Sequence, residues 1–199
     1  MKINMIAAVC KTNSSDKMGI GYRGKIPWNS KMELLFFKNL TTSSNDSSKL
    51  NVVLMGRSTW DSIGRVPLKN RINVILSESL KYKYIDIYTN VFICRSFFEF
   101  IHLCRNILKD VIENIWTIGG SSVYAITAAS PYFYKLYISK IENTFTCDRY
   151  LPSISDIEKI QNYTDEFAYL LNDSNITDNN IIFKNEVWLN KKFTYKSLN

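Results

Sequence analysis

The sequence predicts a single α/β domain with a largely parallel sheet and antiparallel strands added at its C-terminal edge. Short apolar runs recur from the N-terminus, and loops or helical segments separate them, which is typical of a parallel sheet. After Pro131 this alternation stops, and strand-like runs follow without a long helix between them. The chain has 199 residues and is 46% hydrophobic, so it can bury one substantial core.

The first two thirds of the chain give the clearest elements. Short apolar runs bounded by polar or turn residues predict strands at 3–9, 51–55, 72–76, 91–94 and 115–118. Helical segments are expected at 59–63, 96–111 and 123–129. Ser96 is a good N-cap for the second of these helices. Polar segments at 11–17, 45–49 and 81–88 are expected to be irregular.

The last third is less informative. Residues 136–141 and 181–188 are strand-like and are expected to be the antiparallel strands, whereas 153–180 has no clear pattern. No internal repeat or linker is present. We therefore expect one domain over 1–192 and a short polar tail over 193–199.

The charge of the chain favours anionic ligands. Lys and Arg total 25 against 18 Asp and Glu, which gives a net charge of +7. The basic residues are scattered, as on an ordinary solvated surface, and form no arm for nucleic acid. No run reaches the roughly 20 apolar residues of a membrane span, and the N-terminal apolar run is too short for a signal peptide. A cytoplasmic enzyme or binding protein fits these features.

Cysteine and histidine usage argues against several kinds of site. The four cysteines form no CxxC pair and have no metal-ligand spacing, so we expect them to be reduced and expect no metal. His102 is the single histidine and lies in the predicted helix 96–111. A Ser/His/Asp triad or a His-rich zinc site is therefore disfavoured, and His102 is expected to be structural.

Three strand-to-helix junctions are suited to phosphate groups. They have the sequences Gly56-Arg57-Ser58-Thr59, Ser77-Glu78-Ser79 and Gly119-Gly120-Ser121-Ser122. Small and hydroxylated residues at such junctions let a phosphate approach free backbone N–H groups. Each junction alone is also compatible with simple helix capping. Three in one α/β chain suggest a dinucleotide, although none has the GxGxxG form of a standard Rossmann site.

Glu33 is the carboxylate that stands out in the stretch 19–41. Ser30 and Glu33 fit a capping box, in which Glu33 only bonds the backbone of Ser30. Alternatively, Glu33 shares a helical face with Phe37 and Leu40, so its carboxylate emerges from an apolar wall. There it could accept two N–H bonds from an amino-substituted heterocycle, with a pKa raised by desolvation. Arg71 is either a clamp for a carboxylate at the other end of that ligand or an ordinary surface arginine.

Four ordered blocks resemble the dihydrofolate reductase family. They are GIGYRGKIPW with Glu33 five positions after Trp28, VVLMGRSTWDSIG, PLKNRINVILS and WTIGGSSVY. The resemblance covers nearly the whole chain. It implies an eight-stranded, mostly parallel twisted sheet with an antiparallel C-terminal edge and about four helices. It also implies a cytoplasmic monomer, inhibition by antifolates, and NADPH-dependent hydride transfer to C6 of 7,8-dihydrofolate with protonation at N5.

The resemblance assigns roles to individual residues. Glu33 would bind the 2-amino and N3 side of the pterin and support protonation at N5 through a water that Trp28 helps to position. The remaining substrate-binding residues would be Ile6, Ala7, Leu34, Phe37, Ile63, Arg65, Leu68, Arg71 and Ser139, with Arg71 on the α-carboxylate of the glutamate tail and Ser139 near Glu33. On the nicotinamide side, NADPH would contact Ala8, Gly19, Ile20, Gly21, Gly24 and Lys25. Arg57, Ser58 and Thr59 with Ser77 and Ser79 would take the adenosine phosphates, and Gly119 to Tyr124 would wrap the pyrophosphate. The full set of cofactor-binding residues at these junctions would be Gly56, Arg57, Ser58, Thr59, Ser77, Glu78, Ser79, Arg95, Ile118, Gly119, Gly120, Ser121, Ser122, Val123 and Tyr124. A cis peptide bond is implied between Gly119 and Gly120.

The chain departs from the family pattern in two places, and two other functions stay open. The loop 10–18 is long, and Glu78 stands where many members have a basic residue, which bears on the preference for NADPH over NADH. No fused thymidylate synthase is expected. The related reductase of riboflavin synthesis is one alternative, against which the Pro-Trp turn, Glu33 and Arg71 argue. A non-catalytic nucleotide or nucleic-acid binding protein is the other, against which the dispersed charge argues.

Overall fold

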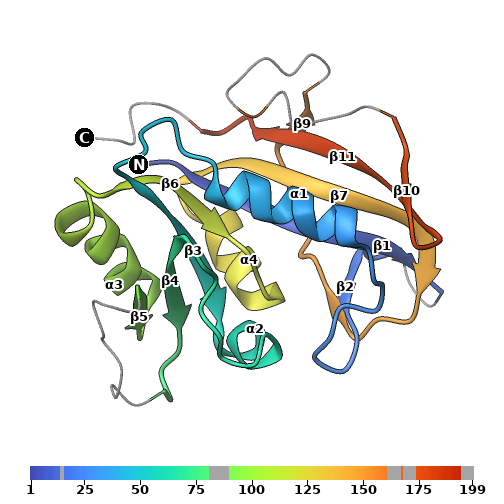
Figure 1. Ribbon diagram of the computed structural model, residues 1–199, viewed down its shortest axis with the longest axis horizontal. Helices are drawn as coiled ribbons and strands as arrows, with labels where there is room; N and C mark the ends of the chain where they lie inside the picture. The colour runs from blue at the N-terminus through green and yellow to red at the C-terminus, as the bar shows by residue number, and fades with distance from the viewer. Residues whose placement is uncertain (14–15, 81–89, 161–166, 168–173, 194–199) are drawn as a thin grey trace.

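A twisted β-sheet forms the centre of the computed structural model (Figure 1). The structure describes residues 1–13, 16–80, 90–160, 167 and 174–193. Its main path contains β1 (Ile3–Thr12), β3 (Leu50–Gly56), β4 (Arg71–Leu76), β5 (Val91–Cys94), β6 (Ile112–Thr117), β7 (Phe133–Phe145), β10 (Ile176–Asp178) and β11 (Ile181–Asn190). Their spatial order is β10-β11-β7-β1-β6-β3-β4-β5. Three short strands lie off this path: β2 (Gly19–Gly21), β8 (Arg149–Tyr150) and β9 (Ile157–Lys159).

The strand directions confirm a mostly parallel sheet with an antiparallel C-terminal edge. β1 is parallel to β6 and β7, β3 is parallel to β4 and β6, and β4 is parallel to β5. β11 is antiparallel to β7, and β10 is antiparallel to β11. The expectation that 136–141 is antiparallel was wrong, because β7 pairs with β1 in parallel. The antiparallel part therefore begins at β11.

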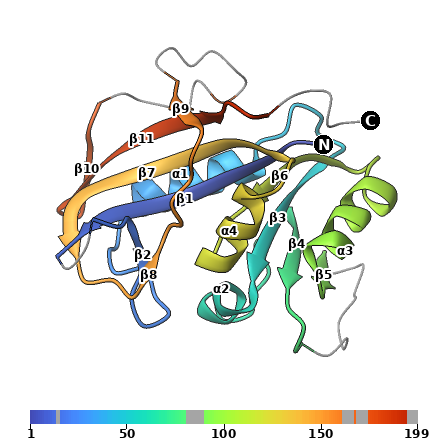
Figure 2. The same cartoon turned by 180° about the vertical axis from the view of Figure 1, so that it is seen from behind.

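Four α-helices flank the sheet in the described part of the chain. They are α1 (Lys31–Thr42), α2 (Arg57–Ser62), α3 (Phe97–His102) and α4 (Ser121–Ala128). α1 lies on the face of the sheet that is turned to the viewer in Figure 1. α4 lies on the opposite face, which is turned to the viewer in Figure 2. Helix α3 continues as a π-helical segment, η2 (Leu103–Ile107), so the predicted helix 96–111 ends early. The backbone turns at Leu108, whose carbonyl accepts from the N–H groups of Val111 and Ile112, and Ile112 begins β6 beside Leu50.

The apolar core divides between the two faces of the sheet. Val52, Leu54 and Val74 pack with Phe100 of α3 and Val123 of α4. The alternate residues Val53, Met55 and Ile75 pack with Phe36 and Leu40 of α1. This alternation is the period of two of a strand, here with both faces buried. Both faces of β3 and β4 are therefore covered by helices.

The predicted strands agree with the structure, and the missed ones are short. β1 continues past the predicted end at Val9 through Thr12, where it pairs with Phe145 after a register shift. The short strands β2, β8, β9 and β10 had no apolar pattern and were not predicted. Segment 81–88 and residues 194–199 of the predicted tail lie outside the described residues.

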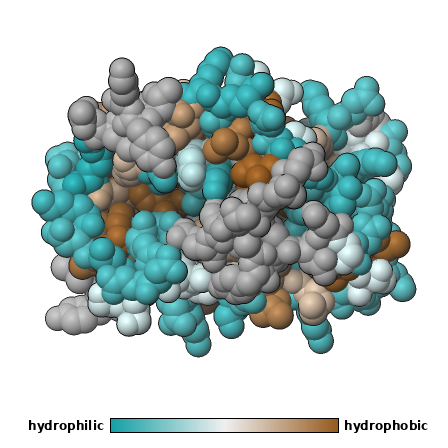
Figure 3. Space-filling view, turned by 90° about the horizontal axis from the view of Figure 1, so that it is seen from above, coloured by the Kyte–Doolittle hydropathy of each residue, from teal (hydrophilic) through white to brown (hydrophobic). Residues whose placement is uncertain are grey.

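The face of the molecule seen from above is mainly polar where its residues are described (Figure 3). Seen from above, brown apolar residues form separate patches among teal polar ones (Figure 3). Among the described residues, no helix combines the length and apolar character needed to cross a membrane.

Candidate functional site

The start of α1 is fixed by a polar contact from the far end of the chain. The Ser30 hydroxyl accepts from the backbone N–H of Glu33 at 3.1 Å and donates to Asp178 of β10 at 2.9 Å. The backbone N–H of Met32 donates to the same carboxylate oxygen at 2.9 Å. Ser30 is therefore the N-cap of α1, as one half of the predicted capping box requires. No sequence pattern singled out Asp178.

The side chain of Glu33 is buried and does not cap the helix. It is 6% exposed, and in the described residues no hydrogen bond joins its carboxyl to the backbone N–H of Ser30. Burial raises its pKa to about 7, and a hydrogen bond from Ser139 opposes the rise. A carboxyl with this pKa can hold or release a proton near neutral pH. The geometry therefore favours the functional reading of Glu33.

Apolar side chains on the same face of the sheet accompany Glu33. Ile6 belongs to the core cluster under α1, and Phe37, Ile63 and Leu68 are half-buried against that cluster. Leu34 is half exposed. Ala7 does not join them, because its side chain lies in the cluster on the opposite face. A contact from Ala7 to a ligand on the α1 face would thus involve its backbone.

Trp28 has a buried polar atom without a partner. Its ring packs 5.6 Å from that of Phe145, centroid to centroid, in a cluster that Ala8 also contacts. The indole Nε1 is buried and has no hydrogen-bond acceptor within the part of the chain that the structure describes. Buried donors are normally satisfied, so this N–H calls for a water or a ligand atom.

Arg71 is held in one orientation and is not a surface residue. It is 6% exposed, its Nη1 donates to Thr41 Oγ1 at 2.7 Å, and its Nε donates to the Lys69 carbonyl at 3.0 Å. Its guanidinium lies 5.8 Å from the ring centroid of Phe37. Burial lowers its pKa, and no carboxylate of the described ranges forms an ion pair with it. Such a guanidinium is suited to an external carboxylate.

Two residues differ from the predicted substrate-binding set. Arg65, predicted to bind substrate, is exposed, and its Nε lies 2.7 Å from the Asp61 carboxylate. Thr41, which was not predicted, orients Arg71 from the last turn of α1. A threonine near a helix end is common, so the sequence carried no signal for this role.

The three glycine- and serine-rich junctions meet at one edge of the sheet. The backbone N–H of Gly56 donates to the Gly119 carbonyl at 2.8 Å, which joins the first junction to the third. Arg57 Nη1 donates to Ser79 Oγ at 2.6 Å, which joins the first to the second. The peptide bond between Gly119 and Gly120 is cis, as the resemblance implies.

This edge leaves room for a phosphate-bearing cofactor. A Cβ added at Gly120 would point at Thr59 Oγ1, 3.5 Å away, and at Ser58 Oγ, 3.9 Å away. The absence of a side chain at Gly120 thus opens a cradle of hydroxyl and backbone N–H groups, the donor set that phosphates prefer. The residues present therefore fit a dinucleotide.

The remaining predicted cofactor residues fall into three groups. Gly19, Ile20 and Gly21 form β2, and Gly24, with a φ of 76°, and Lys25 close the turn that follows it. The exposed residues Glu78 and Arg95 follow β4 and β5, and Ser77 accepts from the Leu80 N–H. In the third group, Ile118 and Ser122 flank the glycines, Ser121 donates to the Tyr150 carbonyl, and Tyr124 donates to the Ile6 carbonyl at 2.7 Å. Val123 is different, because its side chain is buried in the core.

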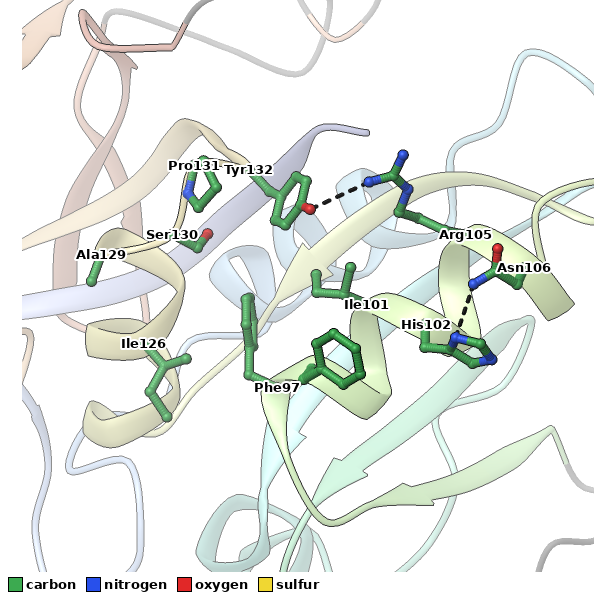
Figure 4. A pocket seen from close by; sticks show the side chains of 11 residues that line it. Phe97, Ile101, His102, Arg105, Asn106, Ile126, Ala129, Ser130, Pro131 and Tyr132 are labelled. Atoms are coloured by element: carbon green, nitrogen blue, oxygen red, sulfur yellow. Dashed lines mark hydrogen bonds between the residues drawn. The ribbon is translucent and has the colours of Figure 1, made fainter. Parts of the chain in front are cut away.

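A cavity of about 700 Å³ lies elsewhere, between α3 with η2 and the end of α4 (Figure 4). Phe97, Ile101, Ile126 and Tyr132 line it, and Arg105 donates to the Tyr132 hydroxyl across it at 3.4 Å. It contains none of the residues predicted for substrate or cofactor. His102 borders it and contacts Asn106 at 3.0 Å, consistent with the expected structural role.

Comparisons with known proteins agree with this geometry. A sequence model described as "Dihydrofolate reductase" matches residues 2–175. The chain is 38% identical to the dihydrofolate reductase of Drosophila melanogaster over 160 residues, which are 78% of this chain and 82% of that protein. It is 37% identical to that of Sus scrofa over 161 residues, which are 79% and 82% of the two chains. The chain belongs to the dihydrofolate reductase family.

Proposed function

We propose that Glu33, Phe37 and Arg71 bind 7,8-dihydrofolate on the α1 face of the sheet, while the three junctions bind NADPH at the adjoining edge. The reaction is the reduction of dihydrofolate to tetrahydrofolate, with a hydride added at C6 of the pterin and a proton at N5. Enzymes of this family use NADPH as the cofactor. The observation that carries the proposal is one buried carboxyl, Glu33, whose pKa is raised to about 7 among apolar side chains.

Glu33 has two tasks in this reaction. Its two oxygens accept the N–H groups of the 2-amino and N3 side of the pterin, a planar pair that matches a carboxylate. Its pKa near 7 lets it take a proton from solvent and pass it toward N5 through a water. The unpartnered Nε1 of Trp28 is suited to donate to that water and fix its position.

Arg71 and the apolar wall orient the other end of the substrate. The guanidinium is fixed by Thr41 and Lys69 and forms no ion pair with a described carboxylate, so it can bind the α-carboxylate of the glutamate tail. Phe37, with Ile63 and Leu68 behind it, excludes water from the pterin ring. Fixing both ends of the substrate restricts its position over the reacting carbon.

The junction residues hold the cofactor. Bound NADPH supplies the hydride. Ser58, Thr59 and the backbone N–H groups after Gly120 bind its phosphates, and Arg57 binds the 2′-phosphate with help from Ser79. Residues 19–25 cover the nicotinamide side and exclude water there.

A spectrophotometric assay of NADPH oxidation with dihydrofolate tests the proposal. The variant Glu33→Ala should fold and bind NADPH, and its kcat/KM at pH 7 should fall about 100-fold or more, because it lacks the proton-transferring group. Glu158→Ala, which removes an exposed glutamate of β9, is the matched control and should be unaffected. Turnover by Glu33→Ala equal to that of the control would contradict the role of Glu33.

We further infer that the protein acts as a single-domain monomer in the cytoplasm. All strands of the described residues belong to one sheet, which supports one domain over 1–192. Buried free cysteines are common in cytoplasmic proteins, and the four cysteines here are free and buried, with the sulfurs of Cys10 and Cys147 3.6 Å apart. Antifolates should bind at the Glu33 site, since they present the same amino-substituted ring edge.

A further inference from the structure

Cys10 and Cys147 bring two free thiols into contact although they are far apart in sequence. Their sulfur atoms lie 3.6 Å apart, and the two residues are 137 positions apart in the chain. Cys10 is 2% exposed and Cys147 is 6% exposed, and both pack in the cluster that contains Trp28. A disulfide bond needs sulfur atoms about 2 Å apart. Only a short movement of the two side chains therefore separates this pair from a bond.

The backbone of Gly19 leaves the space in which the two sulfurs meet. Gly19 of β2 is the partner of Cys10 in β1, and it also pairs with Tyr150 of β8. A Cβ built at Gly19 would lie 2.4 Å from Cys147 Sγ and 2.8 Å from Cys147 Cβ. Any side chain at this position would therefore displace Cys147. The contact between the sulfurs thus depends on β1, β2 and the segment before β8 together.

The other two cysteines provide an internal comparison. Cys94 of β5 and Cys104 of η2 are also free and buried, and they lie in the core cluster beside α3. Within the described ranges, the contact between Cys10 and Cys147 is the one in which two sulfurs come within hydrogen-bonding distance. Proximity, rather than burial, therefore distinguishes this pair.

The segment around Cys147 holds the turn 19–25 in place. The backbone N–H of Asp148 donates to the Gly21 carbonyl at 3.0 Å, and the Asp148 carboxylate accepts from the Arg23 N–H at 3.1 Å. The strands β2 and β8 pair with each other and lie below β1 in Figure 2. A covalent bond from Cys147 to β1 would therefore restrain the segment that fixes this turn.

Burial determines the order in which the two thiols can react. It raises the pKa of Cys10 to about 12, so the thiolate, which is the reactive form, is scarce at Cys10 near pH 7. The sequence neighbours of Cys147, Thr146 and Asp148, are exposed, so a local opening of this short segment admits a small oxidant to Cys147. Cys10 then reacts with the modified sulfur of Cys147, and their proximity favours this second step over reaction with an external thiol.

We propose that Cys10 and Cys147 are a modification site at which a low-molecular-weight disulfide forms a reversible disulfide bond between them, and that this bond restrains the turn 19–25. Cys147 attacks one sulfur of the oxidant, whose S–S bond breaks and releases one thiol. Cys10 then displaces the second thiol from Cys147. The two cysteines lose two protons and two electrons, and the oxidant gains them and leaves as two thiols. The effect on turnover rests on the proposed function, in which this turn covers the nicotinamide, whereas formation of the bond does not.

Peptide mapping after incubation with excess oxidised glutathione tests whether the bond forms. Wild-type protein digested without reductant should yield a peptide in which Cys10 is joined to Cys147, and dithiothreitol should separate its two parts. The melting temperature should rise by about 5 °C, because the bond closes a long loop of the unfolded chain. Three results would overturn the proposal: a glutathione adduct without the joined peptide, an unmodified pair, or a bond between Cys94 and Cys104 in its place.

Two matched variants separate the pair from the other cysteines. Cys147→Ser removes one sulfur and keeps a side chain of similar size, so oxidised glutathione should leave its melting temperature and its turnover unchanged. Cys104→Ser keeps the pair and should respond to the oxidant as wild type does.

The assay of NADPH oxidation with dihydrofolate measures the restraint on the turn. Oxidation of wild type should lower kcat about threefold or more, because release of the product requires the turn to move, and dithiothreitol should restore kcat. An unchanged kcat in protein that contains the joined peptide would overturn the restraint of the turn. Absence of dihydrofolate reduction in the reduced protein would overturn the proposed function, and the peptide map would still decide whether the bond forms.

Discussion

The burial that raises the pKa of Glu33 has a cost in stability. A carboxyl with a pKa of about 7 in the folded protein, against an ordinary 4.5, binds its proton more tightly when folded than when unfolded. Between these two pKa values the folded state keeps a proton that the unfolded chain has lost. Stability therefore falls as the pH rises from about 4.5 to 7, and the loss is complete above pH 7.

The ligand-free variant Glu33→Gln should be more stable than wild type at alkaline pH. Glutamine has nearly the same shape and no charge, so it avoids the desolvation of a carboxylate. The shift in pKa corresponds to about 3 kcal/mol, which is the expected gain at about pH 8.5, whereas the two proteins should have similar stability at about pH 4.5. Urea unfolding at both pH values measures the difference.

The variant Glu158→Gln is the control that shows whether the gain in stability is caused by the burial of Glu33. Glu158 is exposed, so its variant should follow wild type at every pH. A gain for Glu33→Gln that is equal at both pH values would show that the carboxyl is not desolvated in the folded protein.

At the scale of elements, the parallel strands explain why three junctions that are separate in sequence meet at one edge of the sheet, the edge proposed to bind the cofactor. β3 and β4 are neighbours, and β6 lies on the other side of β3, so their carboxyl ends reach the same edge. The segments after them carry Ser58 in the first turn of α2, Ser79, and Gly120 at the N-cap of α4, which are far apart in sequence. The first N–H groups of a helix have no partner within the helix, so the starts of α2 and α4 bring such groups to this edge.

The variant Gly120→Ala should separate folding from cofactor binding. The added Cβ would lie 3.5 Å from Thr59 Oγ1, an ordinary contact, so the melting temperature without ligand should change by no more than about 2 °C. The methyl group would occupy the space between the hydroxyls of Ser58 and Thr59, so the KM for NADPH should rise about tenfold. The KM for dihydrofolate, measured at saturating NADPH, should stay within about twofold. An unchanged KM for NADPH would place the phosphates elsewhere.

Elements with strong apolar patterns were predictable from the sequence. Short strands that are defined only by hydrogen bonds to a partner strand were not. Val91–Cys94 was predicted at its observed bounds because all four residues are apolar, and they pack alternately into the core clusters on the two faces of the sheet. β2 and β10 have three residues each, and only their partners in β1 and β11 define them. The same reason hid Thr41, because a polar residue gains its role from a tertiary neighbour. Helical spacing and position made Glu33 and Arg71 candidates, and the family blocks then favoured binding roles over a helix cap and a surface arginine.

At the scale of the whole molecule, the two faces of the sheet carry different tasks. The α3 and α4 face is packed with aliphatic and aromatic side chains and supports the junctions from behind. The α1 face combines its core cluster with the buried polar groups Glu33, Ser139, Asn185 and Arg71. This separation places the polar groups on α1 and on the rigid central strands, whereas β2 lies off the main path of the sheet.

The net charge of +7 should make cofactor capture depend on salt. Both ligands are anions, and a positive molecule attracts them over about one Debye length, roughly 20 Å at low salt and about 8 Å at physiological ionic strength. Raising the salt from about 20 to 200 mM should therefore lower kcat/KM for NADPH several-fold, with a smaller loss for NADH, which lacks the 2′-phosphate charge. Parallel assays with the two cofactors measure how steeply kcat/KM falls with salt for each. An equal salt dependence for NADPH and NADH would show that the 2′-phosphate adds nothing to the attraction.

Added duplex DNA at physiological salt should not inhibit the enzyme, because the basic residues are scattered. Inhibition by DNA would instead favour a nucleic-acid binding surface.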